Sequence, residues 1–226
     1  MFEIDDEMLS AEFSALMPEQ YGDAYKRLIR PIDFSRREPG EVERQFTDFY
    51  KKYNDGKDTN TMKTIYLAGG CFWGAQRFFD QFEGVVETEV GYANGPTENP
   101  DYKQVCASSG HAETVRVRYD ESVIPTGRLL EYYFMIVDPL SVNKQGEDEG
   151  VQYRTGIYYD DESLLPEIRE AYDKEQAKYE SPMAVELKPL ENFYNAEEYH
   201  QKYLVKNPTG YCHVPFWLLN LNKKES

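Results

Sequence analysis

The short stretch Gly-Gly-Cys-Phe-Trp-Gly at residues 69–74 constrains the fold of this chain more than any other feature. The apolar run at 65–68 that precedes it is typical of a buried strand. The two glycines allow a tight turn and a close approach of other groups to the backbone. The residues that follow predict an amphipathic helix over 71–81, because apolar side chains recur at helical spacing: Phe72, Ala75, Phe78, Phe79 and Phe82.

Cys71 is expected in the first turn of this helix. Unpaired backbone N–H groups and the positive end of the helix dipole at that position favour a thiolate. They can lower a cysteine pKa from about 8.5 to roughly 3.5–7.5. The alternative is that Cys71 is a small buried apolar residue, as many free cysteines are. On the residues alone, both interpretations remain open.

Composition excludes several classes of function. At 226 residues the chain can form one well-buried domain plus an appendage, or at most two small domains. A formal net charge of −16 disfavours nucleic acid or an anionic membrane as the main partner. No apolar run approaches the roughly 18 residues of a membrane span, and the acidic start is unlike a signal peptide. We therefore expect a cytoplasmic protein.

The three cysteines, Cys71, Cys106 and Cys212, are an odd and widely separated set. A secreted disulfide framework normally has an even and denser set. A zinc site needs about four ligands at close spacing, whereas the three histidines fall in unrelated segments. We therefore expect no metal and no cofactor. In a reducing compartment, such cysteines indicate a free thiol or a transient catalytic disulfide.

Two parts of the chain differ in pattern. Residues 1–60 predict a helical N-terminal extension and a polar linker, and the clearest helix, at 39–53, has one apolar stripe: Val42, Phe46, Phe49 and Tyr53. Residues 61–226 form the expected main domain. There we predict further strands at 85–90, 112–119, 152–159 and 183–187, and helices at 126–136, 163–179 and 196–204. This mixture predicts an α+β two-layer sandwich with a mixed sheet, a ferredoxin-like β-α-β core and long loops.

Glu113 is the second candidate for chemistry. In the strand at 112–119 it shares one face with Val115, Val117 and Tyr119. Burial on that face would raise the carboxyl pKa above about 4.3 and keep it protonated, as a general acid requires. The alternative is a solvated carboxylate at the frayed start of the strand.

The stretch Gly-Cys-Phe-Trp-Gly after an apolar strand resembles the active-site signature of the A-class peptide methionine sulfoxide reductases. Further matching segments follow in family order, so that the resemblance covers about residues 62–214. They are Asn-Pro-Asp-Tyr at 99–102, Gly-His-Ala-Glu at 110–113, Gln-Tyr-Arg at 152–154 and Gly-Tyr-Cys at 210–212.

The resemblance implies roles for residues at these matched positions. Cys71 is the implied nucleophile and Glu113 the acid that protonates the sulfoxide oxygen. Tyr102 and Tyr153 are implied to donate hydrogen bonds to that oxygen. Cys212 is the implied resolving thiol, on a tail whose glycine and proline permit movement.

Three further residues have implied supporting roles. Phe72 and Trp73 would form the wall that holds the substrate methyl group, and Asp148 would support the site. The implied reaction is reduction of the S epimer of methionine sulfoxide, free or in proteins, through a Cys71 sulfenic acid and a Cys71–Cys212 disulfide. A thioredoxin-like reductant would regenerate the thiols.

The chain departs from the family pattern at four positions near the site. Val137 and Glu149 stand where histidine is usual, Val151 replaces a common threonine, and Asn94 replaces a glycine. None of these changes removes an implied catalytic group.

Two other functions fit the residues. One is a cysteine-dependent hydrolase or acyltransferase that pairs Cys71 with His111 or His200. The other is a thiol redox sensor that catalyses no reaction. We expect Cys106 to be structural.

Overall fold

A six-stranded sheet organises residues 61–221, the part of the chain that the computed structural model describes. The helices predicted within residues 1–60 lie outside the described residues. The strand order is β7-β6-β1-β3-β2-β8, and all neighbours are antiparallel except the parallel pair β6 and β7. The strands are β1 (Met62–Ala68), β2 (Val85–Ala93), β3 (Ala112–Asp120), β6 (Gly156–Tyr159), β7 (Glu186–Pro189) and β8 (Phe193–Asn195). The predicted α+β class with a mixed sheet is confirmed.

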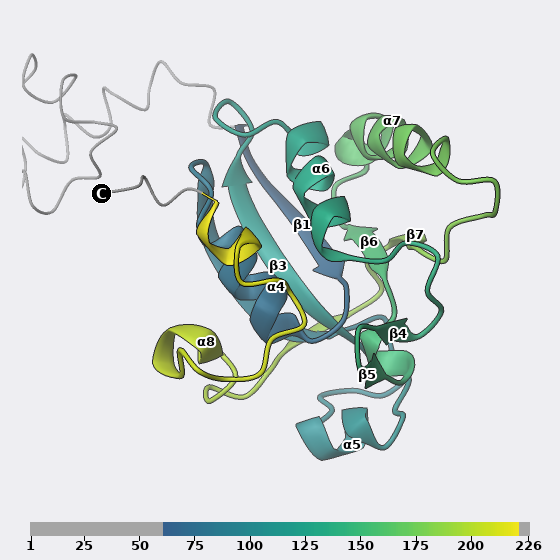
Figure 1. The fold of residues 1–226 in the computed structure, drawn as a ribbon. Helices are drawn as coiled ribbons and strands as arrows, with labels where there is room; N and C mark the ends of the chain where they lie inside the picture. The colour runs from purple at the N-terminus through teal and green to yellow at the C-terminus, as the bar shows by residue number, and fades with distance from the viewer. Residues whose placement is uncertain (1–60, 222–226) are drawn as a thin grey trace, which may run out of the picture. The chain divides into compact units, whose positions relative to one another are not determined.

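The larger helices pack together with the sheet (Figure 1). These are α4 (Phe72–Phe79), α6 (Thr126–Ile136) and α7 (Leu165–Gln176). The smaller elements are α5 (Tyr102–Cys106), α8 (Tyr203–Lys206), the hairpin of β4 (Lys144–Gln145) and β5 (Asp148–Glu149), and three 3₁₀ turns, η3 (Val151–Tyr153), η4 (Glu162–Leu164) and η5 (Leu218–Asn220). No helix within residues 61–221 has the length and apolarity needed to cross a membrane.

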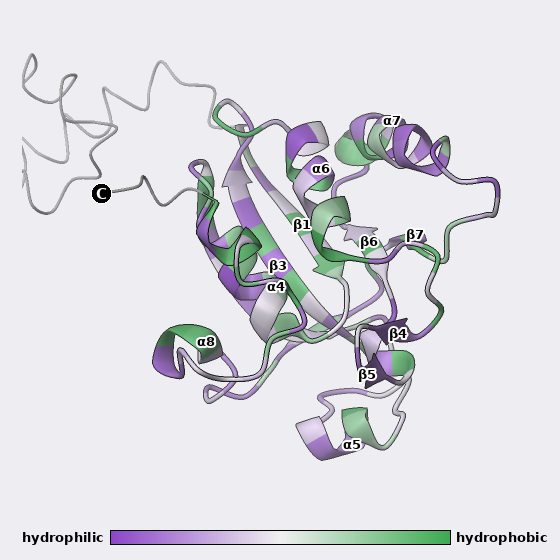
Figure 2. Cartoon of the chain, in the orientation of Figure 1, coloured by the Kyte–Doolittle hydropathy of each residue, from purple (hydrophilic) through white to green (hydrophobic). Residues whose placement is uncertain are grey.

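The core follows from strand alternation. Ile65 and Leu67 of β1 belong to the main core, where they are joined by Phe78 of α4 and Leu129 of α6. The intervening Tyr66 belongs to a smaller cluster. This is the period of two expected of strand side chains. Figure 2 shows the resulting mixture of hydrophobic and hydrophilic positions along β3.

Most predicted elements are present, and α6 has the predicted bounds. The strand predicted over 152–159 is wrong in its first half, where η3 replaces it and β6 begins only at Gly156. Gly150 precedes η3 with a φ of 149°, in the region that favours glycine. The Tyr153 N–H bonds back to the Gly150 carbonyl at 3.0 Å, which closes a turn instead of a ladder.

The helix predicted over 196–204 is also wrong, because only the short helix α8 forms there. Most of this segment forms turns, with backbone hydrogen bonds to the carbonyl three residues back, and contacts with distant elements hold it. The Gln76 side chain accepts a hydrogen bond from the Lys202 N–H at 2.6 Å, and Lys202 itself has a left-handed φ of 52°. Gln201 bonds both backbone groups of Val90 in β2. Tertiary contacts thus overrode local helix propensity.

Candidate active site

Cys71 occupies the N-cap position of α4, at the end of the turn that follows β1. Its backbone is extended (φ −61°, ψ 120°), and the residue is 6% exposed. Gly70 before it has a φ of +74°, so the turn requires glycine. A Cβ on Gly70 would lie 2.8 Å from the Gln145 Cβ, and one on Gly69 would lie 2.5 Å from a Val137 methyl group. The tight turn and close approach expected from the sequence are both present.

The protonation of Cys71 differs from the sequence-based expectation. Burial raises the pKa of the Cys71 thiol well above its ordinary value, and the nearby Glu113 carboxyl raises it further. A hydrogen bond from the Trp73 N–H at the helix N-terminus acts in the opposite direction. The dipole argument is right in sign, but desolvation outweighs it. Cys71 is therefore a thiol in the resting state.

Glu113 lies beside this thiol at the start of β3. The carboxyl is 1% exposed, and its Oε2 accepts a hydrogen bond from the Phe72 N–H at 3.1 Å. Burial raises the pKa of Glu113 from 4.5 to about 8, although the hydrogen bond from Phe72 lowers it. This agrees with the parity argument and excludes the solvated alternative. At neutral pH the carboxyl carries a proton that it can donate.

Tyr102 and Tyr153 lie near enough to Glu113 for its carboxyl to influence both phenols. Burial is the main cause that raises the pKa of each phenol, and the Glu113 carboxyl raises both further. Cys71 also raises the pKa of Tyr153. Both phenols therefore stay protonated and can donate hydrogen bonds. The structure thus brings together four of the candidate groups.

An aromatic wall adjoins these groups. The Phe72 ring is buried 5.1 Å from the His200 ring, and the half-buried Trp73 stacks on Tyr203 at 3.7 Å. The Trp73 indole N–H donates to the His200 Nδ1 at 2.9 Å. Sequence reasoning did not assign His200 and Tyr203 to this wall, because they lie in a segment expected to be a plain helix.

Cys212 packs against the same helix from the C-terminal tail. A Cβ on Gly74 would lie 2.8 Å from the Cys212 Sγ, so the absent side chain makes room for this thiol. Gly74 lies three residues after Cys71, on the same side of the first helical turn. Asp148 anchors the tail, since its carboxylate accepts a hydrogen bond from the Tyr211 hydroxyl at 3.0 Å. All three cysteines are free thiols, and Cys106 is exposed at the end of α5.

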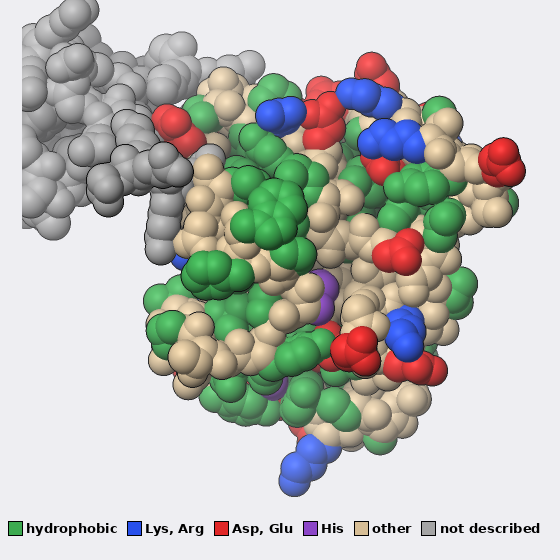
Figure 3. All heavy atoms as spheres, in the orientation of Figure 1, with side chains coloured by type: hydrophobic (Ala, Val, Ile, Leu, Met, Phe, Trp, Pro, Cys, Tyr) green, Lys and Arg blue, Asp and Glu red, His purple; other side chains and the backbone are tan. Residues whose placement is uncertain are grey.

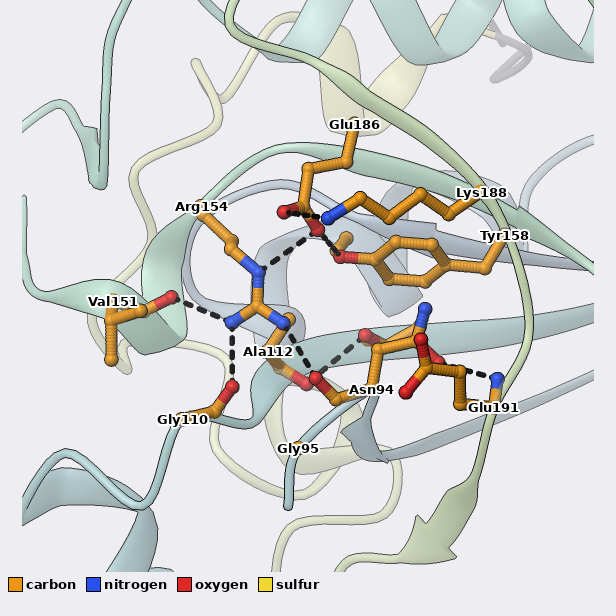
Figure 4. Close-up of polar contacts among 12 residues, drawn as sticks. Asn94, Gly95, Gly110, Ala112, Val151, Arg154, Tyr158, Glu186, Lys188 and Glu191 are labelled. Atoms are coloured by element: carbon orange, nitrogen blue, oxygen red, sulfur yellow. Dashed lines mark hydrogen bonds and ion pairs between the residues drawn. The ribbon is translucent and has the colours of Figure 1, made fainter.

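Arg154 ties together the segments that carry these groups (Figure 4). Its guanidinium donates to three backbone carbonyls, each at 3.1 Å: those of Asn94, Gly110 and Val151. It also pairs with Glu186 at 3.1 Å. The Gly110 segment leads into Glu113, and Val151 begins the turn that presents Tyr153. Sequence reasoning gave Arg154 no role, although a charged residue within a motif was a usable signal.

The substituted positions fit their surroundings. Asn94 has a left-handed φ of 49°, which asparagine tolerates better than most residues, and its side chain bonds the backbone of Pro189 and Glu191. Glu149 forms an exposed ion pair with Lys144.

Within residues 61–221, no group of His, Cys, Asp and Glu side chains could hold a metal ion. Figure 3 shows histidine atoms in a hollow of the face it presents, with acidic side chains beside them.

Comparisons with known proteins agree with this site. The sequence profile described as "Peptide methionine sulfoxide reductase" matches residues 63–225. The chain is 56% identical to the peptide methionine sulfoxide reductase MsrA of Lachnoclostridium phytofermentans over 153 residues, 67% of this chain and 92% of the relative. It is also 56% identical to the MsrA of Clostridium acetobutylicum over 159 residues, 70% of this chain and 98% of the relative.

Solved structures give the same result. The reduced form of Mxr1 from Saccharomyces cerevisiae superposes with a TM-score of 0.64 at 38% identity, covering 69% of this chain and 91% of that one. The methionine sulfoxide reductase A of Corynebacterium diphtheriae gives 0.61 at 34% identity, covering 69% and 79%. With its fold, its buried Cys71–Glu113 pair and these relatives, the chain belongs to the peptide methionine sulfoxide reductase family, in the MsrA class.

Proposed function

We propose that this protein reduces the S epimer of methionine sulfoxide, free or in proteins, to methionine. The observation that carries the proposal is the juxtaposition of a buried thiol and a protonated carboxyl at one helix N-terminus. Cys71 is the N-cap residue of α4, and the Glu113 carboxyl accepts a hydrogen bond from the N–H of the next residue, Phe72, at 3.1 Å. A thiol nucleophile with a neutral acid beside it is what oxygen transfer from a sulfoxide requires.

The raised pKa values of both groups suggest how the protons move. The Glu113 carboxyl donates its proton to the sulfoxide oxygen, while the Cys71 sulfur attacks the substrate sulfur and its thiol proton passes to the carboxylate. This attack forms an S–S bond, and the adduct carries the former sulfoxide oxygen as a hydroxyl on the substrate sulfur. The hydroxyl then moves to the Cys71 sulfur as the substrate S–O bond and the S–S bond both break, so that methionine leaves and Cys71 carries a sulfenic acid. Glu113 ends the step protonated as it began. Tyr102 and Tyr153 donate hydrogen bonds to the oxygen, and Phe72 and Trp73 hold the methyl group.

Cys212 completes the cycle in this proposal. Its thiol attacks the sulfenic sulfur of Cys71, water leaves, and a Cys71–Cys212 disulfide forms. The packing of the Cys212 Sγ on Gly74 supports this assignment, as does the electrostatic influence of Cys212 on Cys71. A thioredoxin-like dithiol protein then reduces the disulfide by thiol–disulfide exchange. Asp148 supports the site by anchoring Tyr211, the residue before Cys212.

The direct test supplies each methionine sulfoxide epimer in turn, with dithiothreitol as reductant, and measures methionine by chromatography. We expect turnover of the S epimer and none of the R epimer. Turnover of neither epimer by folded, fully reduced protein would contradict the proposal.

The hydrolase and acyltransferase alternative is not favoured by the histidine contacts. The His200 Nδ1 accepts its hydrogen bond from Trp73, and the His111 Nδ1 bonds the Ser109 hydroxyl at 3.0 Å. Neither contact orients an imidazole toward Cys71. The sensor alternative is not favoured either, because an acid poised beside the thiol serves turnover.

We also propose a ferredoxin-like core and a division of the chain into two parts. The order β6-β1-β3-β2 with antiparallel neighbours supports a ferredoxin-like core. We further propose that residues 61–226 form the catalytic domain, that 1–60 are a helical extension, and that the protein is cytoplasmic. The family match begins at residue 63, so a chain that lacks residues 1–60 should retain catalysis. A well-folded truncation without turnover would contradict this division.

A further inference from the structure

We propose that His213 is the base of the resolving step: it takes the proton of the Cys212 thiol and returns it to the hydroxyl that leaves the Cys71 sulfenic acid. The inference rests on the proposed function, but it concerns a second chemical step and a residue that the first step does not use. His213 follows Cys212 directly in the chain.

His213 lies at the same end of α4 as Cys71. The His213 Cε1 and Nε2 both lie 3.0 Å from the point that a Cβ on Gly70 would occupy, so the ring packs on the residue joined to Cys71. The Cys212 Sγ and the His213 Cε1 both lie near the corresponding point on Gly74, at 2.8 Å and 3.6 Å. The pair Cys212–His213 therefore spans the N-terminus of α4, with the ring at the end that carries Cys71.

The ring nitrogens of His213 are buried. Among residues 61–221, neither Nδ1 nor Nε2 forms a hydrogen bond of good geometry, and the Gly69 carbonyl is the backbone acceptor that acts on the ring. His111 and His200 differ, because one nitrogen of each is bonded, to Ser109 and to Trp73. Buried polar atoms without partners are uncommon and call for an explanation. A ring that must accept a proton and then release it explains nitrogens that are not held by a close hydrogen bond at this place.

The resolving thiol needs a base. Burial raises the pKa of Cys212, and the Asp148 carboxylate raises it further. Cys212 therefore rests as a thiol that donates to the Val214 carbonyl at 3.4 Å, whereas a thiolate is needed to attack the sulfenic acid. The Asp148 carboxylate already accepts a hydrogen bond from the Tyr211 hydroxyl at 3.0 Å.

His213 has the charge that the step requires. Burial lowers its pKa, so the resting ring is neutral and can accept a proton. Asp148 and the Gly69 backbone carbonyl act in the opposite direction and favour the imidazolium. The Asp148 carboxylate therefore stabilises an imidazolium by its charge, although it does not hold the ring through a hydrogen bond.

The step balances as follows. The Cys212 thiol gives its proton to the imidazole, and the thiolate attacks the Cys71 sulfur as the bond from that sulfur to its hydroxyl breaks. The S–S bond forms, the sulfenic sulfur is reduced and the Cys212 sulfur is oxidised. The departing hydroxyl takes the proton from the imidazolium and leaves as water. His213 is neutral again, and no outside oxidant or reductant takes part.

The test is a rapid-quench single turnover with methionine S-sulfoxide and no reductant, in a Cys106→Ser background. It measures methionine release and Cys71–Cys212 disulfide formation separately, for His213 and for the His213→Gln and His213→Asn variants. We expect disulfide formation to slow about 100-fold or more relative to methionine release, the usual weight of a general base. Added imidazole should restore part of the lost rate.

The outcomes separate the two proposals. If both steps slow by the same factor, or if disulfide formation keeps its rate in either variant, His213 is not the base. A variant that is folded only in part would show the same loss in both steps without rescue by imidazole, which counts against the inference. If the unmodified protein releases no methionine, the proposed function itself fails, whatever His213 does.

Discussion

The Glu113 carboxyl and the Phe72 backbone N–H are joined by a 3.1 Å hydrogen bond between the start of β3 and the first residue of α4. Through this bond, one of the N–H groups that lack a partner within the helix is donated to the acid and not to the Cys71 sulfur. The bond therefore fixes the carboxyl beside the nucleophile. Because the site is desolvated, both groups keep their protons in the resting state.

Replacing the nucleophile gives the simplest prediction. Cys71→Ser should abolish methionine formation, because a serine hydroxyl cannot accept the sulfoxide oxygen as a sulfenic acid does, while the melting temperature stays close to that of the wild type. Cys106→Ser is the matched control. Cys106 is exposed, and a serine hydroxyl can keep the hydrogen bond that its side chain makes with Tyr102, so this variant should keep most of the activity. Activity of Cys71→Ser within tenfold of the wild type would contradict the mechanism.

Glu113→Gln should lower turnover by about 10²–10⁴-fold, the usual weight of a general acid. In the wild type, Glu113 is protonated below its pKa of about 8, so methionine formation should fall as the pH rises through 8. The variant should lack this inflection. Steady-state rates between pH 6 and 9.5 test both points, with the exposed Glu83→Gln as control. A variant with a near-normal rate would assign the acid role to another group.

The same substitution should stabilise the fold above pH 4.5. Between 4.5 and about 8 the unfolded carboxyl is ionised while the folded one is neutral, so Glu113 reduces the free energy of unfolding as the pH rises. The gain on Glu113→Gln should grow by at most about 1.4 kcal/mol per pH unit and level off above pH 8. Urea unfolding at pH 4, 6 and 8.5 measures it. A gain that is the same at all three values would mean that Glu113 is not held neutral.

Arg154→Lys should impair catalysis through position. Lysine keeps a charge for Glu186 but cannot reach three carbonyls at once, so the segments that carry Glu113 and Tyr153 lose their common anchor. We expect kcat to fall about 10- to 100-fold with a smaller change in KM. Arg128→Lys, at an exposed ion pair, is the control. Equal kinetics for the two variants would show that the Arg154 network does not position the acid.

The sequence motifs predicted the candidate groups of the site. Strand alternation also placed the Glu113 side chain correctly on the buried face of β3. The sequence did not predict the protonation of Cys71, because the helix dipole is a local effect whereas desolvation depends on what covers the site. The segment at 196–204 was misread as a helix for a similar reason. Its backbone is bonded by Gln76, which lies more than a hundred residues away, and no local pattern signals such a contact.

The structure of the loops could not be predicted from local sequence patterns either. The β4–β5 hairpin that presents Asp148 has two residues in each strand, too few for a periodic signal. Arg154 lay within a motif, but its three carbonyl partners come from separate turns. The role proposed for His213 depends on its packing against Gly70 and Gly74. This contact exists only in the folded protein, because the C-terminal tail must first pack onto α4 and its entry turn.

The measurement that tests the account most directly is a single turnover of the S epimer by reduced protein without reductant, followed by peptide mapping under conditions that trap thiols. About one methionine per protein should form, together with a Cys71–Cys212 disulfide and free Cys106. A dominant Cys71–Cys106 bond would reassign the resolving role. A Cys71 that stays a thiol, with no methionine released, would contradict the central claim that this buried cysteine reduces methionine sulfoxide.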